Sequence, residues 1–186
     1  MSQTTFLAVQ PLNHLRQIDR NGPVSSDLPL VEGIYFSWDD KDTEVRLDLT
    51  SPPGQLCTLD GRITGEPGWL TLNITLGNWR FAPGDVLGLV ADVTGASCTP
   101  YLRSRESDVW SDTALPVLVG GKVTPRTILQ CFDAHDGAVG PESFHTLVLP
   151  LPRRSFSWTL RDLAIFTLPA SAGLRPEPLS LSSFAI

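Results

Sequence analysis

The sequence predicts an all-β fold in which two antiparallel sheets pack as a jelly-roll-like sandwich, with a partly closed β-barrel as the alternative. Apolar and polar residues alternate strictly in several segments, as in strands with one face on a core and one in water. Turn signals separate these segments at intervals of about ten residues, the spacing of sandwiches and barrels. The chain also has 15 glycines and 16 prolines among 186 residues, and such frequent breakers favour short strands over long helices.

Four segments carry the alternation, and each is predicted to be a strand of an antiparallel sheet because its polar positions face water. Their apolar positions are Ile34, Phe36 and Trp38; Val45, Leu47 and Leu49; Leu70, Leu72, Ile74 and Leu76; and Leu147, Leu149 and Leu151.

The remaining elements depart from this pattern. Residues 86–93 are apolar at both parities until Asp92, which predicts a central strand covered on both faces. Apolar residues with threefold spacing predict one short helix near residues 11–20. A further turn of helix is expected around residues 106–113.

The longest predicted strand, residues 156–168, changes the parity of its apolar residues half-way. A β-bulge at Arg161 and Asp162 would return both apolar sets to the same core. We expect Asp162 to accept hydrogen bonds at this bulge, from backbone amides or an arginine, because an unpaired carboxylate in an apolar strand is costly.

Composition restricts the class of protein. The net charge is −6 and the isoelectric point is near 4.9, and a nucleic-acid partner is not expected because such a surface needs a basic excess. No run approaches the roughly 20 apolar residues of a membrane span. Three cysteines without close spacing are expected to be buried apolar residues, with a Cys57–Cys98 bridge as the alternative.

We expect one sandwich domain over residues 1–170. The tail, residues 171–186, is rich in proline and serine but ends in apolar residues, so we expect it to pack in extended form on its own sandwich or on a neighbouring subunit. The N-terminus shows no signal peptide pattern. The sequence therefore predicts a cytoplasmic protein, or part of a particle assembled in the cytoplasm.

Catalytic signatures are weak. There is no Gly-x-Ser-x-Gly elbow, no His-Glu-x-x-His and no phosphate-binding glycine loop, so no cofactor is expected. A glycosidase needs two carboxylates across a cleft, and Glu106, Asp108 and Asp112 are near enough in sequence to supply them. Exposed acids are common, however, and the sequence favours a protein without catalytic activity.

One cluster has the composition of a metal site. Asp133 and His135 would point the same way at a strand end, Asp136 could bend in from the turn, and His145 could join from the next strand. Nitrogen and oxygen ligands of this kind suit a transition metal. The alternative is an ordinary polar turn.

A second cluster has the composition of a ligand-binding surface. Tyr101, Arg103 and Arg105 alternate onto one face, and Asp108 and Trp110 follow in an acidic, serine-rich stretch. Sugar rings stack on exposed aromatic side chains while arginine and aspartate bind their hydroxyls. The alternative is that Trp110 belongs to the core and the arginines are solvated.

Trp69 lies on the polar parity of its strand, so it is also a candidate for an exposed aromatic platform.

The succession of short strands resembles jelly-roll carbohydrate-binding modules over residues 30–168. The likeness rests on the buried Val-Leu-Gly-Leu-Val strand and on the final Trp-Thr-Leu-Arg-Asp-Leu-Ala-Ile-Phe strand, since these modules often close on a last strand with a central aspartate. Their calcium loop is not recognisable here.

The sequence and the resemblance together predict a non-catalytic binding module for a carbohydrate or similar polar ligand. The first alternative is a structural or assembly subunit of a homo-oligomer or larger particle, including a virion, which would self-associate through its tail. The second is a jelly-roll enzyme that acts on a glycan.

Overall fold

The computed structural model describes residues 4–118, 120 and 125–172. Its elements are β1 (Thr5–Leu7), α1 (Val9–Gln17), β2 (Arg20–Val24), β3 (Pro29–Val31), β4 (Ile34–Trp38), β5 (Glu44–Ser51), β6 (Cys57–Thr64), β7 (Leu70–Trp79), β8 (Val86–Thr94), β9 (Tyr101–Glu106), β10 (Val109–Ala114), β11 (Arg126–Cys131), β12 (Ser143–Pro150), β13 (Phe156–Leu168) and the 3-10 turn η1 (Ala170–Ala172).

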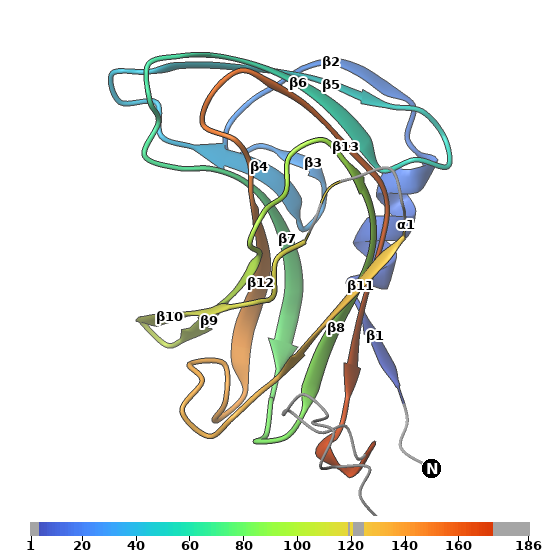
Figure 1. The fold of residues 1–186 in the computed structure, drawn as a ribbon, viewed down its shortest axis with the longest axis vertical. Helices are drawn as coiled ribbons and strands as arrows, with labels where there is room; N and C mark the ends of the chain where they lie inside the picture. The colour runs from blue at the N-terminus through green and yellow to red at the C-terminus, as the bar shows by residue number, and fades with distance from the viewer. Residues whose placement is uncertain (1–3, 119, 121–124, 173–186) are drawn as a thin grey trace, which may run out of the picture.

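The strands form two antiparallel sheets that pack face to face (Figure 1). One sheet, which we call the back sheet, has the order β11-β8-β13-β6-β5-β2, with β1 beside β13. The other, which we call the front sheet, has the order β10-β9-β12-β7-β4-β3. These two names do not refer to the viewing direction of Figure 1. Neither sheet closes into a barrel within the described residues. The predicted sandwich is confirmed, and the barrel alternative is wrong.

The core lies between the sheets and is built from the apolar positions that the alternation picks out. Leu47 and Leu49 of the back sheet and Leu147 and Leu149 of the front sheet are all fully buried. Trp158 is the largest side chain buried in this layer. Because successive residues of a strand face opposite sides, the polar residues between these positions lie on the outer faces of the sandwich.

The expected short helix is present, at Val9–Gln17 instead of residues 11–20, but the helical turn predicted around residues 106–113 is wrong. That segment is the β9–β10 hairpin, which reverses at Ser107 with a φ of 53°. Arg103 and Asp112 face each other across it, and opposite charges in directly paired positions stabilise a hairpin.

The bulge in β13 is confirmed. Its pairing with β8 shifts register between Leu160 and Asp162, and Leu160 and Leu163 are both buried on its two sides. Asp162 is exposed, yet its Oδ1 accepts hydrogen bonds from Arg16 Nε at 2.9 Å, Arg16 Nη2 at 2.6 Å and the Leu163 amide at 2.9 Å. One carboxylate therefore links helix α1 to the bulge.

The second face of β8 is covered from the neighbouring strand. Phe166 of β13 is paired with Gly88 of β8, and its ring lies over the glycine where a Cβ atom would otherwise stand. Phe156 and Gly61 form the same arrangement between β13 and β6. An aromatic ring thus fills the space that each glycine leaves open.

The cysteines are free thiols, so the Cys57–Cys98 bridge considered above is wrong. Burial raises the pKa of both Cys57 and Cys98 to about 12, which keeps them protonated.

No helix among the described residues is long and apolar enough to cross a bilayer. The predicted packing of the tail, residues 171–186, stays a prediction because residues 173–186 lie outside the described residues.

Candidate functional site

The candidate site lies on the outer face of the front sheet, where one row of paired residues crosses four strands. Tyr101 of β9 is paired with Val148 of β12, Val148 with Asn73 of β7, and Asn73 with Tyr35 of β4. Three strand spacings of about 4.8 Å separate the Cα atoms of the two tyrosines by roughly 14 Å. The tyrosines therefore stand as two walls with Val148 and the polar side chain of Asn73 between them.

The floor of this row is shielded although it faces away from the core. Asn73 is 6% exposed, Thr71 7% and Val148 1%, whereas residues on the outer face of a flat sheet would be open to water. The surface is concave here and forms a hollow with a volume of about 370 Å³. We call this hollow the sheet groove; its lining residues are Asp27, Tyr35, Ser37, Trp69, Thr71, Asn73, Tyr101 and Arg103.

The walls of the sheet groove present neutral phenols. Burial raises the pKa of Tyr35 and Tyr101, and the nearby carboxylates of Asp27 and Asp112 raise it further for Tyr35 and Tyr101 respectively. Arg103 lowers both pKa values, but burial is the largest influence. At neutral pH both hydroxyls remain protonated and can donate as well as accept hydrogen bonds.

Arg103 is held in place by a bidentate ion pair across the β9–β10 hairpin. Its Nε and Nη2 atoms donate to the two carboxylate oxygens of Asp112 at 2.8 and 2.7 Å. This hydrogen bonding raises the pKa of Arg103. The guanidinium also lies 5.3 Å from the ring centroid of Tyr101, within cation–π range. The positive charge at the edge of the groove is therefore fixed in orientation.

Trp69 forms the open end of the groove and is 51% exposed. Its indole Nε1 donates to Ser37 Oγ at 3.3 Å, and its carbonyl accepts from the Asp39 amide at 3.1 Å. Asp39 Oδ2 in turn accepts from the Gly68 amide at 3.1 Å, and a Cβ atom on Gly68 would approach that oxygen to 2.8 Å. These contacts hold the loop in place while about half of the Trp69 side chain stays open to solvent.

The structure brings together only part of the predicted ligand surface. Tyr101, Arg103 and Trp69 line the sheet groove. The other members lie farther along the hairpin: Arg105 stacks 5.1 Å from the ring of Trp110, and Asp108 is at the turn with a fully exposed side chain.

Trp110 is 58% exposed, so the alternative that it belongs to the core is wrong.

Sequence reasoning missed Tyr35, Asp27 and the polar floor. A usable signal was present, because Tyr35 is an aromatic residue on the polar parity of an alternating strand, as Trp69 is. Asp27 carried no signal of this kind, since it lies in a loop and has a left-handed φ of 59°.

The residues of the predicted metal cluster form a hydrogen-bonded turn. Asp133 Oδ1 accepts from the His135 amide at 2.6 Å, and Asp136 Oδ2 accepts from the Asp133 amide at 2.8 Å. Among the described residues no three His, Cys, Asp or Glu side chains group as a metal site requires. A metal at Asp133, His135 and Asp136 stays a prediction without geometric support.

His145, expected to extend that cluster, is instead fully buried in the core. Its Nε2 is 3.0 Å from the Trp79 carbonyl, which can only accept, so Nε2 donates and Nδ1 accepts from Ser104 Oγ at 2.8 Å. Burial lowers the pKa of His145. This serine–histidine pair is sealed from solvent and cannot reach a substrate.

No protein-family model and no curated protein matches the sequence. Among solved structures, a cyclase from Fischerella sp. TAU superposes with a TM-score of 0.56 at 10% identity, covering 90% of this chain and 98% of the cyclase. A Stig cyclase from the same organism, in complex with (3Z)-3-(1-methyl-2-pyrrolidinylidene)-3H-indole, gives 0.53 at 11% identity over 90% and 99% of the two chains.

A family 11 carbohydrate-binding module from Clostridium thermocellum, in complex with a β-1,3-1,4-mixed-linked tetrasaccharide, gives a TM-score of 0.46 at 9% identity over 80% and 95% of the two chains. The resemblance to carbohydrate-binding modules is thus present as a weak likeness of structure. At these identities the comparisons establish the fold alone.

Proposed function

We propose that this protein is a non-catalytic binding module whose sheet groove holds one ring of a carbohydrate or of a similar polar ligand. The observation that carries the proposal is the shielded polar floor at Thr71 and Asn73, walled by two neutral phenols. Small-molecule sites combine an apolar or aromatic enclosure with a few oriented polar groups, and a volume near 370 Å³ is at the small end of their range of about 300–1,000 Å³.

The groove offers a sugar both kinds of contact it needs. The exposed face of Trp69 can stack against the C–H face of a pyranose ring. Around it, the hydroxyls of Tyr35 and Tyr101, the Asn73 amide and the Asp27 carboxylate can exchange hydrogen bonds with the ring hydroxyls. Tyr35, Asn73 and Tyr101 come from three different strands of one sheet, so the sheet fixes their spacing.

The acids around the groove favour binding over catalysis. Glycoside hydrolysis uses two carboxyl groups on opposite sides of the scissile bond, one of which must be able to donate a proton. Asp112 is bound on both oxygens by Arg103, which leaves Asp27 as the carboxylate of the groove lining. This supports a module that holds its ligand without cleaving it.

The test is a screen of the wild-type protein on a glycan array, followed by calorimetry of Trp69→Ala and Trp110→Ala with the best ligand. Trp110 is a matched control because it is a tryptophan of similar exposure, 58% against 51% for Trp69, and does not line the groove. If a sugar covers roughly 60 Å² of the exposed indole at about 25 cal/mol per Å², Trp69→Ala costs about 1.5 kcal/mol, or roughly tenfold in Kd. Trp110→Ala should change Kd less than about twofold.

Two results would count against the proposal. The absence of binding to any glycan on the array would remove the ligand class. Loss of binding in Trp110→Ala with none in Trp69→Ala would place the ligand on the hairpin instead of in the groove. Thermal melting of both variants separates these results from misfolding.

The aromatic walls also favour a second candidate, a flat heteroaromatic ligand between Tyr35 and Tyr101. The Stig cyclase noted above was solved with an indole compound of this kind. Titration with the same compound, monitored by the fluorescence of the exposed tryptophans, distinguishes this ligand class from a sugar.

A further inference from the structure

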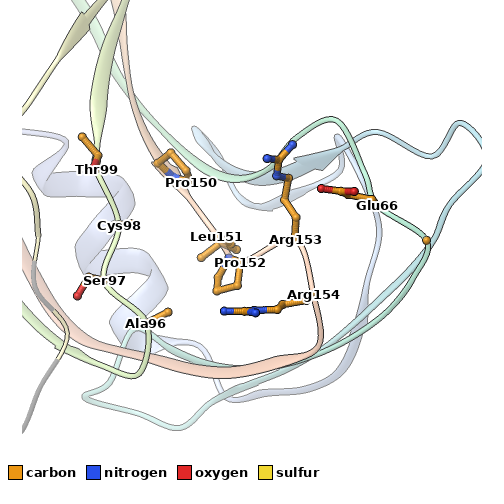
Figure 2. Close-up of a pocket in the computed structure, with 11 residues that line it drawn as sticks. Glu66, Ala96, Ser97, Cys98, Thr99, Pro150, Leu151, Pro152, Arg153 and Arg154 are labelled. Carbon is orange, nitrogen blue, oxygen red and sulfur yellow. The ribbon is translucent and has the colours of Figure 1, made fainter.

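A second and larger hollow, of about 700 Å³, lies at one end of the sandwich (Figure 2). Three connections border it: the β6–β7 turn, the β8–β9 loop and the β12–β13 loop. We call it the loop pocket; its lining residues are Gly65, Glu66, Ala96, Ser97, Cys98, Thr99, Pro150, Leu151, Pro152, Arg153 and Arg154.

The walls of the loop pocket are anchored to the sheets. Leu151 donates its amide to the Leu70 carbonyl at 2.8 Å, which fixes the start of the β12–β13 loop. Cys98 and Leu118 exchange two backbone hydrogen bonds of 3.0 and 2.8 Å, which fix the β8–β9 loop. The pocket is therefore an open hollow between fixed loops, and Leu151 and the neighbouring prolines give it a partly apolar lining.

The pocket lining has more positive than negative charge, with two arginines against the single carboxylate of Glu66. Figure 2 shows Arg153 on the side of Glu66, while the side chain of Arg154 extends the other way toward Ala96. This local excess is notable in a chain whose net charge is −6.

Both guanidinium groups have N–H donors without an acceptor among the described residues. Arg153 uses Nη1 to contact the carbonyls of Pro67 at 3.5 Å and Gly68 at 3.2 Å, and its other donors have no partner among the described residues. Arg154 makes no hydrogen bond or ion pair with any described residue. An arginine has five donors in a planar fork that matches the oxygens of a carboxylate or sulfate, so such an anion is the complementary ligand.

The loop pocket adjoins the sheet groove. Arg153 binds the carbonyl of Gly68, and the next residue is Trp69 of the groove. Pro150 of the pocket is paired with Thr71 of the groove floor. The two hollows are therefore lined by residues that neighbour one another in the chain or across β7 and β12.

From this arrangement we infer that the ligand is an acidic oligosaccharide, with one ring in the sheet groove and the carboxylate or sulfate of a neighbouring sugar on Arg154 in the loop pocket. This inference rests on the proposed function and adds the charge class of the ligand to it. Arg154 acts as the anion-binding group, whereas Arg153 holds the loop that carries Trp69 through the carbonyls of Pro67 and Gly68.

The experiment compares ligands that differ in charge and little else. Calorimetry is performed with tetragalacturonic acid and with its fully methyl-esterified form, and in parallel with mannuronate and chondroitin sulfate tetrasaccharides. The protein variants are Arg154→Ala and, as a control with the same change in net charge, Arg80→Ala. Arg80 is exposed at the far end of β7, roughly 30 Å along the strand from the loop pocket.

We expect at least one acidic tetrasaccharide to bind more tightly than the neutral ester. Arg154→Ala should weaken that binding about tenfold and leave the affinity for the neutral ester within twofold. Arg80→Ala should leave both affinities within twofold. Raising the salt concentration should reduce the preference for the acid, because exposed charges are screened.

The outcomes separate the two proposals. If the neutral form binds as well as the acids, or if Arg154→Ala leaves the preference intact, the anion site is wrong while the sheet groove stands. If an acid binds through Arg154 but Trp69→Ala has no effect, the groove is wrong and the anion site stands. If no tetrasaccharide and no glycan on the array binds, both are wrong.

Discussion

The contact between Arg16 and Asp162 gives a sharp prediction about stability. Asp162→Ala removes the acceptor of the Leu163 amide at the bulge and the partner of the Arg16 guanidinium. A part-buried amide left without a partner costs about 1 kcal/mol, and an ion pair as exposed as this one contributes about 0.5 kcal/mol. We therefore expect a loss of about 1.5 kcal/mol, or roughly 3–6 °C in Tm for a chain of this size.

Two further variants separate these contributions. Asp162→Asn keeps an oxygen for the Leu163 amide and should cost no more than about 0.5 kcal/mol, the share of the ion pair. Arg16→Ala combined with Asp162→Ala in a double-mutant cycle should give a coupling of about 0.5 kcal/mol, smaller in 1 M salt. Asp60→Ala, an exposed aspartate of the same sheet, is the control and should be nearly neutral.

The assay is urea denaturation monitored by tryptophan fluorescence, because Trp158 of the same strand, β13, is buried in the core. An unchanged midpoint in Asp162→Ala would refute the reasoning. Equal losses in Asp162→Ala and Asp162→Asn would also refute it, because the bulge amide would then need no acceptor.

Three other predictions concern the core and the loop that carries Gly68 and Trp69. The pKa of His145 is lower in the folded chain than its ordinary value of 6.5, so the contribution of the neutral histidine to the free energy of unfolding is fully present above that pH. It is lost as the pH falls below 6.5, by at most about 1.4 kcal/mol per pH unit. In thermal melts between pH 7 and 5, the Tm of His145→Asn should therefore fall less with pH than the Tm of the wild type. Gly88→Ala should lower Tm by several degrees, because the added Cβ atom would overlap the ring of Phe166. The second change Phe166→Leu should recover part of this loss. An unchanged Tm in Gly88→Ala would contradict the packing of Phe166 on Gly88. Gly68→Ala should weaken ligand binding more than it lowers Tm, because its Cβ would meet the Asp39 carboxylate that positions the loop, and calorimetry beside a melting curve distinguishes the two effects.

The local sequence pattern was sufficient to predict the structural features that depend only on neighbouring residues of the chain. Alternation with period two follows from the geometry of a strand, so it identified the core faces of the sheets before any pairing was known. The parity change in residues 156–168 required an extra residue, and the structure has the bulge at that place. The hydrogen-bonded role of Asp162 followed from the cost of an unpaired carboxylate, although its exposure and its partner on α1 did not.

The turn of helix expected around residues 106–113 shows where local reasoning was insufficient. Serine, aspartate and arginine in that segment are compatible with several backbones, and cross-strand pairing decides between them. The position of His145 was missed for the same reason, because its partners Ser104 and Trp79 lie far from it in the sequence.

The candidate site itself depended on tertiary structure. The sequence singled out Tyr101, Arg103 and Trp69 as aromatic or charged residues on polar faces, and the structure places all three in one groove. The sequence did not indicate that Tyr35 and Asn73 belong to the same groove, because the strands that carry these residues become neighbours only through the strand order β9-β12-β7-β4. Strand order and register are set by how the whole core packs, and a row of residues across a sheet exists only once they are fixed. The sequence by itself thus determined which faces of which strands meet water, while the tertiary structure decided which of those faces meet one another.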